Sequence, residues 1–216
     1  GIMHLLAHGF FKALLFLGSG SVIHGCHGEQ DIRKMGGLRR LMPVTFGTYA
    51  VGMMALSGVP LFFSGGWTKE EILQAAAQWP RSHAPYYLML AGVVLTALYM
   101  TRQMIYVFFG SRRSAAEHAH ESPRVMTMPL ILLAIGTVFL SLVLTTAWPW
   151  LHGYLEGEAV RFEITRLIQP MLWISLLLVG GSIAMGIWFY GKAGVQAGDR
   201  PAQVDPLEYA QPRLFR

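Results

Sequence analysis

The most distinctive chemistry in this sequence lies in three basic side chains, His4, His8 and Lys12, spaced four residues apart in an apolar run. On a helix of 3.6 residues per turn they form one narrow stripe, which also takes in Ser19. Imidazoles exchange protons near neutral pH, and a buried lysine amine can be tuned to do the same. The stripe therefore predicts a proton relay. The alternative is a helix end with two interfacial histidines and a lysine that reaches to water.

A second charged group, Lys69 with Glu70 and Glu71, follows a stretch of helix-breaking residues. The chain is expected to leave the helical conformation around Gly58, Pro60, Gly65 and Gly66. Thr68 and Glu71 have capping-box spacing, which predicts a second half-helix with Thr68 as its N-cap and Lys69 as its first residue. A cation is disfavoured there, at the positive end of a helix dipole. Broken helices at membrane depth line cavities or ion paths, whereas the alternative is a plain surface loop.

Two other polar segments could take part in such a relay. Arg102 lies in a later apolar run, and it is expected either to reach the membrane surface or to face the bundle as a supporting partner. The connection 117–121 holds two histidines between glutamates and is expected to be a solvated loop, with proton collection as the alternative. Three glycines of the last apolar run are expected at helix contacts: Gly180, Gly181 and Gly186.

The segment His24-Gly-Cys26-His27 has the residue types of a metal site but not its pattern. It lacks a fourth ligand and does not have zinc spacing, so no metal is predicted. Cys26 is the only cysteine, which excludes an internal disulfide or a thiolate cage. No cofactor is therefore expected in this chain.

The amino-acid composition indicates whether the protein lies in water or in a membrane. Of 216 residues, 53% are apolar and only 13% are charged, whereas soluble domains have about 25% charged residues. This excludes a soluble globule and a disordered chain. The net charge is +5, but the basic residues cluster between apolar runs, which is typical of membrane proteins and not of nucleic-acid binding.

Five apolar runs can each cross a bilayer as a helix of about 20 residues. The predicted crossings are Ile2 to Ile23, Pro43 to about Gln78, Tyr86 to Phe109, Met128 to Trp148 and Pro170 to Tyr190. No strict alternation of apolar and polar residues is present, which disfavours a β-barrel. The predicted fold class is all-α: a polytopic transmembrane helix bundle with one interrupted helix.

Lys and Arg residues gather in alternate connections, which predicts the orientation of the bundle. The segments after the first, third and fifth crossings are basic, whereas the other two hold Arg81 and the glutamates Glu156, Glu158 and Glu163. The alternation requires the interrupted segment to cross once, and the basic side is expected to be cytoplasmic. No signal peptide is visible, and we expect the chain to be the later part of a longer protein.

Four segments carry a family resemblance: HLLAHGFFKALLFLGSGSVIHG, EQDIRKMGGLRRLMP, ALSGVPLFFSGGWTKEEIL and HAHESPRVMTMPL. In this order they resemble the later half of the largest antiporter-like membrane subunit, the chain L type, of proton-pumping NADH:quinone oxidoreductase (respiratory complex I). By that resemblance His4, His8 and Lys12 match the central proton relay, and Lys69 matches the lysine of the second broken helix. Ser19, Glu70, Glu71 and Arg102 would support them.

The resemblance implies an antiporter-like inverted-repeat fold and a division of this chain. Residues 1–110 would be part of the second repeat, residues 111–190 the C-terminal transmembrane helices, and residues 191–216 a cytoplasmic tail leading to a lateral helix. It further implies proton translocation coupled to quinone reduction elsewhere in the complex, the other membrane-arm subunits as partners, and a multi-pass location in the bacterial plasma membrane. The alternatives are a subunit of a multisubunit cation/proton antiporter and a membrane subunit of a hydrogenase-type complex.

Overall fold

The computed structural model describes residues 2–59, 63–143, 150, 153–154, 157 and 170–195. The regular elements of these residues are all helical, which confirms the predicted all-α fold class. The long helices are α1 (Ile2–Gly25), α2 (Pro43–Ser57), α3 (Ser64–Ala77), α4 (Ala84–Phe108), α5 (Arg124–Val143) and α7 (Pro170–Val195). Three single turns, η1 (Ile32–Lys34), η2 (Leu38–Arg40) and η3 (Ser114–Ala116), lie in the connections.

Four of these helices are long and apolar enough to cross a membrane: α1, α4, α5 and the part Trp173–Gly191 of α7. Their large apolar side chains face outward in many places, as in Leu5, Leu88, Leu132 and Leu177. A soluble protein would bury such side chains, so outward apolar faces fit a bundle surrounded by lipid.

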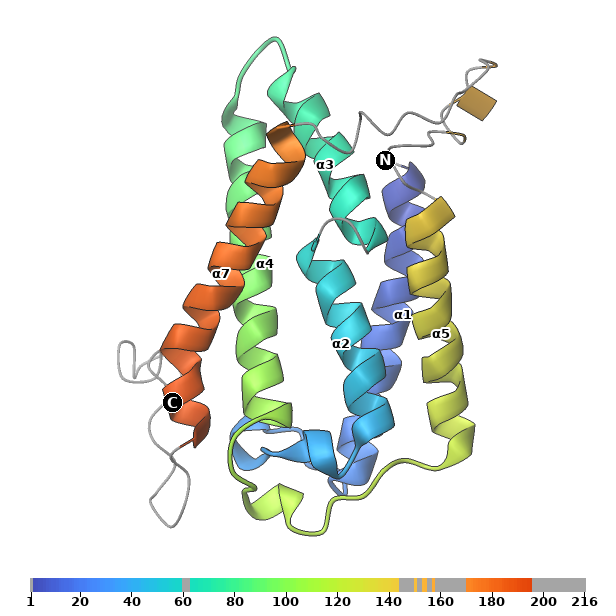
Figure 1. The fold of residues 1–216 in the computed structure, drawn as a ribbon, viewed down its shortest axis with the longest axis vertical. Helices are drawn as coiled ribbons and strands as arrows, with labels where there is room; N and C mark the ends of the chain where they lie inside the picture. Colours follow the sequence, from blue (N-terminus) through green and yellow to red (C-terminus); the bar gives the residue numbers. More distant parts are fainter. Residues whose placement is uncertain are drawn as a thin grey trace.

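The predicted interrupted crossing is present as two half-helices. α2 has 15 residues and α3 has 14, so neither reaches the roughly 20 residues that a full crossing needs. Figure 1 shows α2 and α3 one above the other beside α1, which runs along both of them. α2 ends at Ser57 and is capped by Gly58, whose positive φ of 84° a residue with a side chain rarely adopts. Residues 43–77 therefore traverse the bundle once, as predicted; Pro60 lies outside the described residues.

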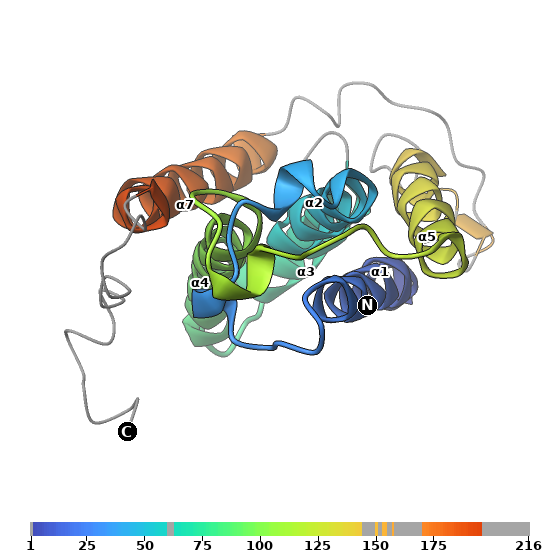
Figure 2. The same ribbon diagram turned by 90° about the horizontal axis from the view of Figure 1, so that it is seen from below.

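Seen along the bundle, the two half-helices occupy its middle (Figure 2). α1 packs against α2, α3 and α5, while α4 packs against α2, α3 and α7. Phe11 of α1 and Phe108 of α4 are almost fully buried in the same apolar cluster as Met42, which precedes α2. The broken crossing thus lies between continuous helices on two sides, α4 and α7 on one and α1 and α5 on the other.

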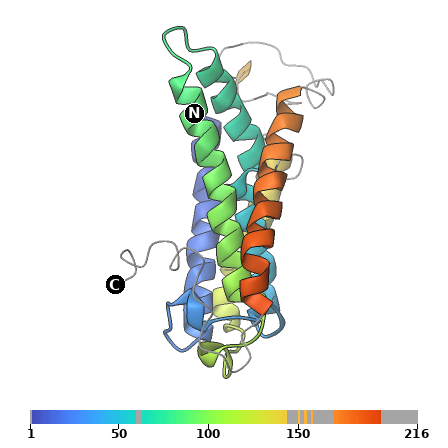
Figure 3. The same cartoon turned by 90° about the vertical axis from the view of Figure 1, so that its left-hand side faces the viewer.

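The two described basic connections, 26–42 and 109–123, meet at one end of the bundle, which we call the basic end (Figure 3). Gly37 donates its N–H to the carbonyl of Phe109 at 3.0 Å, and Arg113 donates to the carbonyls of Ile32 and Arg33. This confirms that the two arginine-rich connections share an end. The glutamates of 156–163 and the tail 196–216 lie outside the described residues.

The prediction of a solvated loop at 117–121 is wrong for Glu121. Its carboxylate accepts hydrogen bonds from the N–H groups of Val44 and Thr45, at 2.8 and 3.3 Å, and from Thr45 Oγ1 at 2.6 Å. The first N–H groups of a helix have no partner within the helix, and α2 has no capping side chain of its own. Glu121 supplies that cap from 76 residues away.

Candidate functional site

The side chains of His4 and His8 lie on one flank of α1, as their spacing predicts. Their ring centroids are 5.7 Å apart, and both rings pack against Phe11, with centroid distances of 6.3 and 5.2 Å. Both histidines are half-buried. His4 Nδ1 is 2.9 Å from Thr68 Oγ1, so this flank faces the half-helix α3.

The half-helix α3 starts earlier in the sequence than predicted. Thr68 is not an N-cap: α3 begins at Ser64, with Phe63 at the capping position, so Thr68 and Lys69 lie in the second turn. Gly65 explains the difference. A Cβ on Gly65 would lie 1.8 Å from the carbonyl oxygen of Ala55, so the glycine allows the start of α3 to press against the end of α2. Tertiary packing has overridden the glycine's poor helix propensity.

The amine of Lys69 donates a hydrogen bond to the main-chain carbonyl of Leu56, in the last turn of α2. A Cβ at Gly58 would be only 3.2 Å from Lys69 Cδ, so the absence of a side chain there leaves room for the lysine. The last carbonyls of a helix lack partners and form the negative end of its dipole. The prediction that Lys69 sits at a positive helix end is therefore wrong, because its amine reaches the negative end of the other half-helix.

The two lysines of the candidate site influence each other and the histidines. Lys69 interacts electrostatically with Lys12 and with His4, and Lys12 also interacts with His8. Like charges at close range in a poorly solvated region repel strongly. These four side chains therefore form one electrostatically coupled group.

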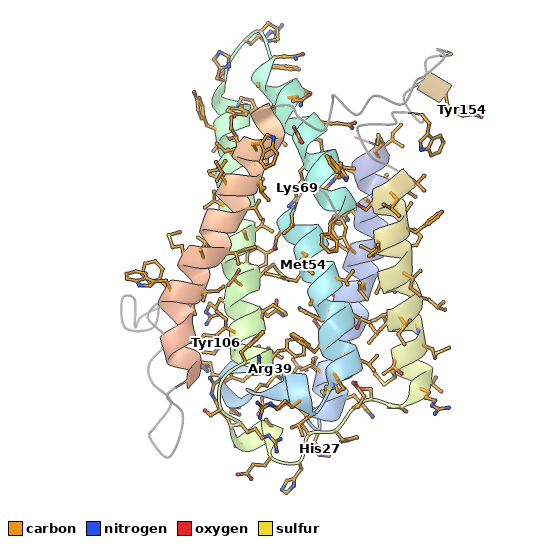
Figure 4. All side chains as sticks on the ribbon, in the orientation of Figure 1. His27, Arg39, Met54, Lys69, Tyr106 and Tyr154 are labelled. Atoms are coloured by element: carbon orange, nitrogen blue, oxygen red, sulfur yellow. The ribbon has the colours of Figure 1, made fainter. Side chains whose placement is uncertain are left out.

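A cavity of about 280 Å³ opens beside the break, between α3 and α4. Its polar lining comes from His4, Lys69 and Thr96, and its apolar lining includes Leu73 and Val93. A buried water needs two to four polar partners, and this lining offers them. Figure 4 places Lys69 at the level of the break, away from both ends of the bundle.

A second polar link crosses the bundle closer to the basic end. The Tyr49 side chain, on α2, interacts with the side chains of Ser19 on α1 and Gln103 on α4. A Cβ at Gly18 would be 2.7 Å from the Tyr49 ring, so the ring fits only against a glycine. Sequence analysis missed Tyr49, because a tyrosine in an apolar run has no distinguishing pattern.

The remaining predicted supporting residues lie apart from this link. Arg102 is stacked on the rings of Tyr106 and Tyr190, with its guanidinium 5.0 and 5.8 Å from their centroids, at the contact of α4 with α7. Glu70 is buried, with 4% of its surface exposed, and its carboxylate lies 3.5 Å from the Gln74 amide. Glu71 is half-buried on the same helix.

Three histidines gather at the basic end. The His120 ring lies 6.0 Å from that of His24 and 5.5 Å from that of His27. Across the ranges that the structure describes, no group of three or more His, Cys, Asp or Glu side chains is arranged to hold a metal ion.

Buried hydroxyls extend inward from Glu121 at this end. Thr45 Oγ1, which donates to Glu121, is 2.7 Å from Ser21 Oγ. Ser21 in turn donates to Ser122 Oγ at 2.8 Å. This cluster joins α1, α2 and the 109–123 connection.

The sequence of this chain is similar to one protein family and to several known proteins. Residues 1–101 match the family described as "NADH:quinone oxidoreductase/Mrp antiporter, TM". The chain is similar to NADH-quinone oxidoreductase subunit L of Mycobacterium tuberculosis, with 44% identity over 189 residues, covering 86% of this chain and 29% of that protein. The same subunit of Rickettsia conorii is 40% identical over 210 residues, covering 91% of this chain and 31% of that protein.

The subunit L of Neisseria meningitidis serogroup B is 42% identical over 220 residues, covering 90% of this chain and 32% of that protein. The chain therefore spans roughly a third of the length of the curated relatives it matches.

Proposed function

Because its residues 1–101 match the family described as "NADH:quinone oxidoreductase/Mrp antiporter, TM", we propose that this chain is part of a proton-translocating subunit of the L type in an NADH:quinone oxidoreductase. The observation that carries the proposal is the Lys69 amine at the break between α2 and α3. It lies beside a cavity that it shares with His4. A titratable amine beside a cavity that is lined in part by polar groups suits proton exchange at membrane depth.

In the proposed mechanism protons pass between groups held on different helices. His4, His8 and Lys12 on α1 carry a proton along the stripe, and Lys69 on α3 exchanges it through the cavity. Repulsion between Lys12 and Lys69 couples their protonation, so that a charge arriving at one favours release from the other. The link from Ser19 through Tyr49 to Gln103 supports a polar connection toward the basic end.

The redox chemistry in this proposal belongs to other subunits. This chain would sit in the membrane arm, in contact with its neighbouring membrane subunits, and respond to charge movements that quinone reduction sets off. The bacterial relatives favour the plasma membrane as its location, with the basic end on the cytoplasmic side.

The second candidate is a subunit of a multisubunit cation/proton antiporter, which the description of the matching family also names. The two candidate functions differ in what drives proton movement, which is NADH oxidation in the first and a cation gradient in the second. In inverted vesicles holding the full-length subunit and its complex, NADH oxidation should acidify the lumen, and a double variant Lys12→Met and Lys69→Met should lose this acidification. If an added sodium gradient, and not NADH, moves protons in these vesicles, the antiporter reading replaces the proposal.

A further inference from the structure

A cavity of about 590 Å³ lies at the basic end, away from the relay, where α2, α4 and α7 meet. Its inner wall is formed by apolar side chains, among them Met53, Met104, Ile105, Ile183 and Ile187. The one hydroxyl in this wall belongs to Thr101, and it already donates to the carbonyl of Ala97 at 2.7 Å. The described inner wall of the cavity therefore has no side-chain donor left without an acceptor, and its apolar surface suits a hydrocarbon chain.

The mouth of the cavity has the opposite character. Arg39, Gly110 and Ser111 line it. The Arg39 guanidinium stacks over the Phe109 ring, 4.9 Å from its centroid, and the arginine is otherwise exposed. Within the described part of the chain, Arg33 forms a salt bridge with Asp31 and Lys34 forms one with Glu29, and Arg39 takes part in neither. Its guanidinium can therefore donate to an anion outside the protein.

The depth of the cavity is limited by a close helix contact. Of the three glycines expected at helix contacts, Gly186 lies against a described neighbour: a Cβ there would be 2.9 Å from Thr101 Cγ2, whereas at Gly180 and Gly181 nothing described lies within 4 Å. This contact closes the gap between α4 and α7 at the level of Thr101. Thr101 lies eight residues before Phe109, which corresponds to about 12 Å along the helix at 1.5 Å per residue. A transmembrane helix of a partner could not pass through, whereas a single acyl chain fits.

The polarity, charge and depth of the cavity together indicate which kind of molecule it can bind. The charged mouth lies at the level where predicted crossings end, and the apolar interior extends from it toward the bilayer centre. Basic pockets between transmembrane helices bind anionic lipid headgroups. We propose that this cavity binds an anionic phospholipid, with its phosphate at Arg39 and one acyl chain between α4 and α7.

The test is lipid photolabelling of the assembled complex that contains the full-length subunit, in nanodiscs. The probe is phosphatidylglycerol with a photoreactive diazirine on one acyl chain, compared with phosphatidylcholine carrying the same group. Peptides covering 100–109 and 183–191 should be labelled preferentially by phosphatidylglycerol. Arg39→Gln should lower this labelling about five-fold, since each basic residue near the surface adds about that factor to the binding of anionic lipid.

Matched variants separate the site from general lipid contact. Arg40→Gln removes a neighbouring exposed arginine that does not line the cavity, and it should leave the labelling unchanged. Ile187→Trp fills the cavity and should abolish labelling, whereas Leu177→Trp on the outer face of α7 should not.

Equal labelling by the two lipids, or no difference between Arg39→Gln and Arg40→Gln, would overturn the proposal. So would crosslinking of this site to another protein in place of lipid.

Discussion

The amine of Lys69 in α3 is hydrogen-bonded to the main-chain carbonyl of Leu56 in α2, across the break of the interrupted crossing. The bond ties the two half-helices together through a side chain that can change its charge. A protonated amine satisfies a terminal carbonyl of α2 better than a neutral one, because charge strengthens the bond. The junction between the half-helices is therefore expected to respond to the protonation of Lys69.

Lys69→Arg tests whether that response matters. Arginine keeps the positive charge and can still donate to Leu56, but its guanidinium does not deprotonate in proteins. We expect normal assembly and a marked loss of proton flux per electron, measured in reconstituted vesicles and normalised to assembled complex. Lys34→Arg, an exposed lysine paired with Glu29, is the matched control and should pump normally. Full pumping by Lys69→Arg would mean that Lys69 acts as a fixed charge.

Lys12→Met should lower proton flux more than it lowers the abundance of the complex. Lys12 is half-buried near the middle of α1 and interacts with both His8 and Lys69. Methionine has a similar length and keeps the apolar packing, so the main loss is the titratable amine. The same vesicle assay measures this. Wild-type flux per electron in the Met variant would favour the alternative in which Lys12 only reaches to the membrane surface.

Gly65→Ala should damage the junction itself. The added methyl would lie 1.8 Å from the Ala55 carbonyl oxygen, which belongs to the backbone and cannot move aside cheaply. Overpacking of this kind costs about 3 kcal/mol, so the yield and thermal midpoint of the assembled complex should fall. Gly47→Ala, on α2 with nothing within 4 Å in the described structure, should be neutral or stabilising, since alanine is the better helix former. Equal stability of the two variants would contradict the tight approach of α3 to α2.

Glu121→Ala should loosen the start of α2. It removes the carboxylate that caps Val44 and Thr45, and loss of a cap costs about 1 kcal/mol. Hydrogen exchange of the amides at 44 and 45 should then become about five-fold faster, by the same estimate. Glu117→Ala in the same connection changes an exposed glutamate and should leave this exchange as it is. Unaltered exchange in Glu121→Ala would show that α2 does not depend on this cap.

Single-cysteine labelling tests the orientation of the bundle. In sealed vesicles of a Cys26→Ala background, cysteines at positions 39 and 113 should react from the same face, because both connections lie at the basic end (Figure 3). A cysteine at 81 should react from the other face, as should one at 156. Reaction of positions 39 and 113 from opposite faces would eliminate the arrangement of four continuous crossings and one interrupted crossing.

The sequence by itself determined the features that depend on neighbours along the chain. Apolar run lengths located the helices to within a few residues, as in Ile2–Gly25 for α1 and Ala84–Phe108 for α4. Gly58 marked the break, and the four-residue spacing put His4 and His8 on one flank. Such properties follow from hydropathy, helical periodicity and backbone freedom, which are local.

Only the tertiary structure decided which partners the polar groups find. Thr68 has the spacing of an N-cap, but it bonds His4, which is 64 residues away. Lys69 reaches the end of the other half-helix, and Glu121 caps a helix 76 residues before it. Tyr49 joins three helices without any sequence signal. Buried polar groups must be satisfied by whichever donor or acceptor the packed helices bring near, and helix packing is set by side chains distant in sequence, such as the glycines that let backbones approach.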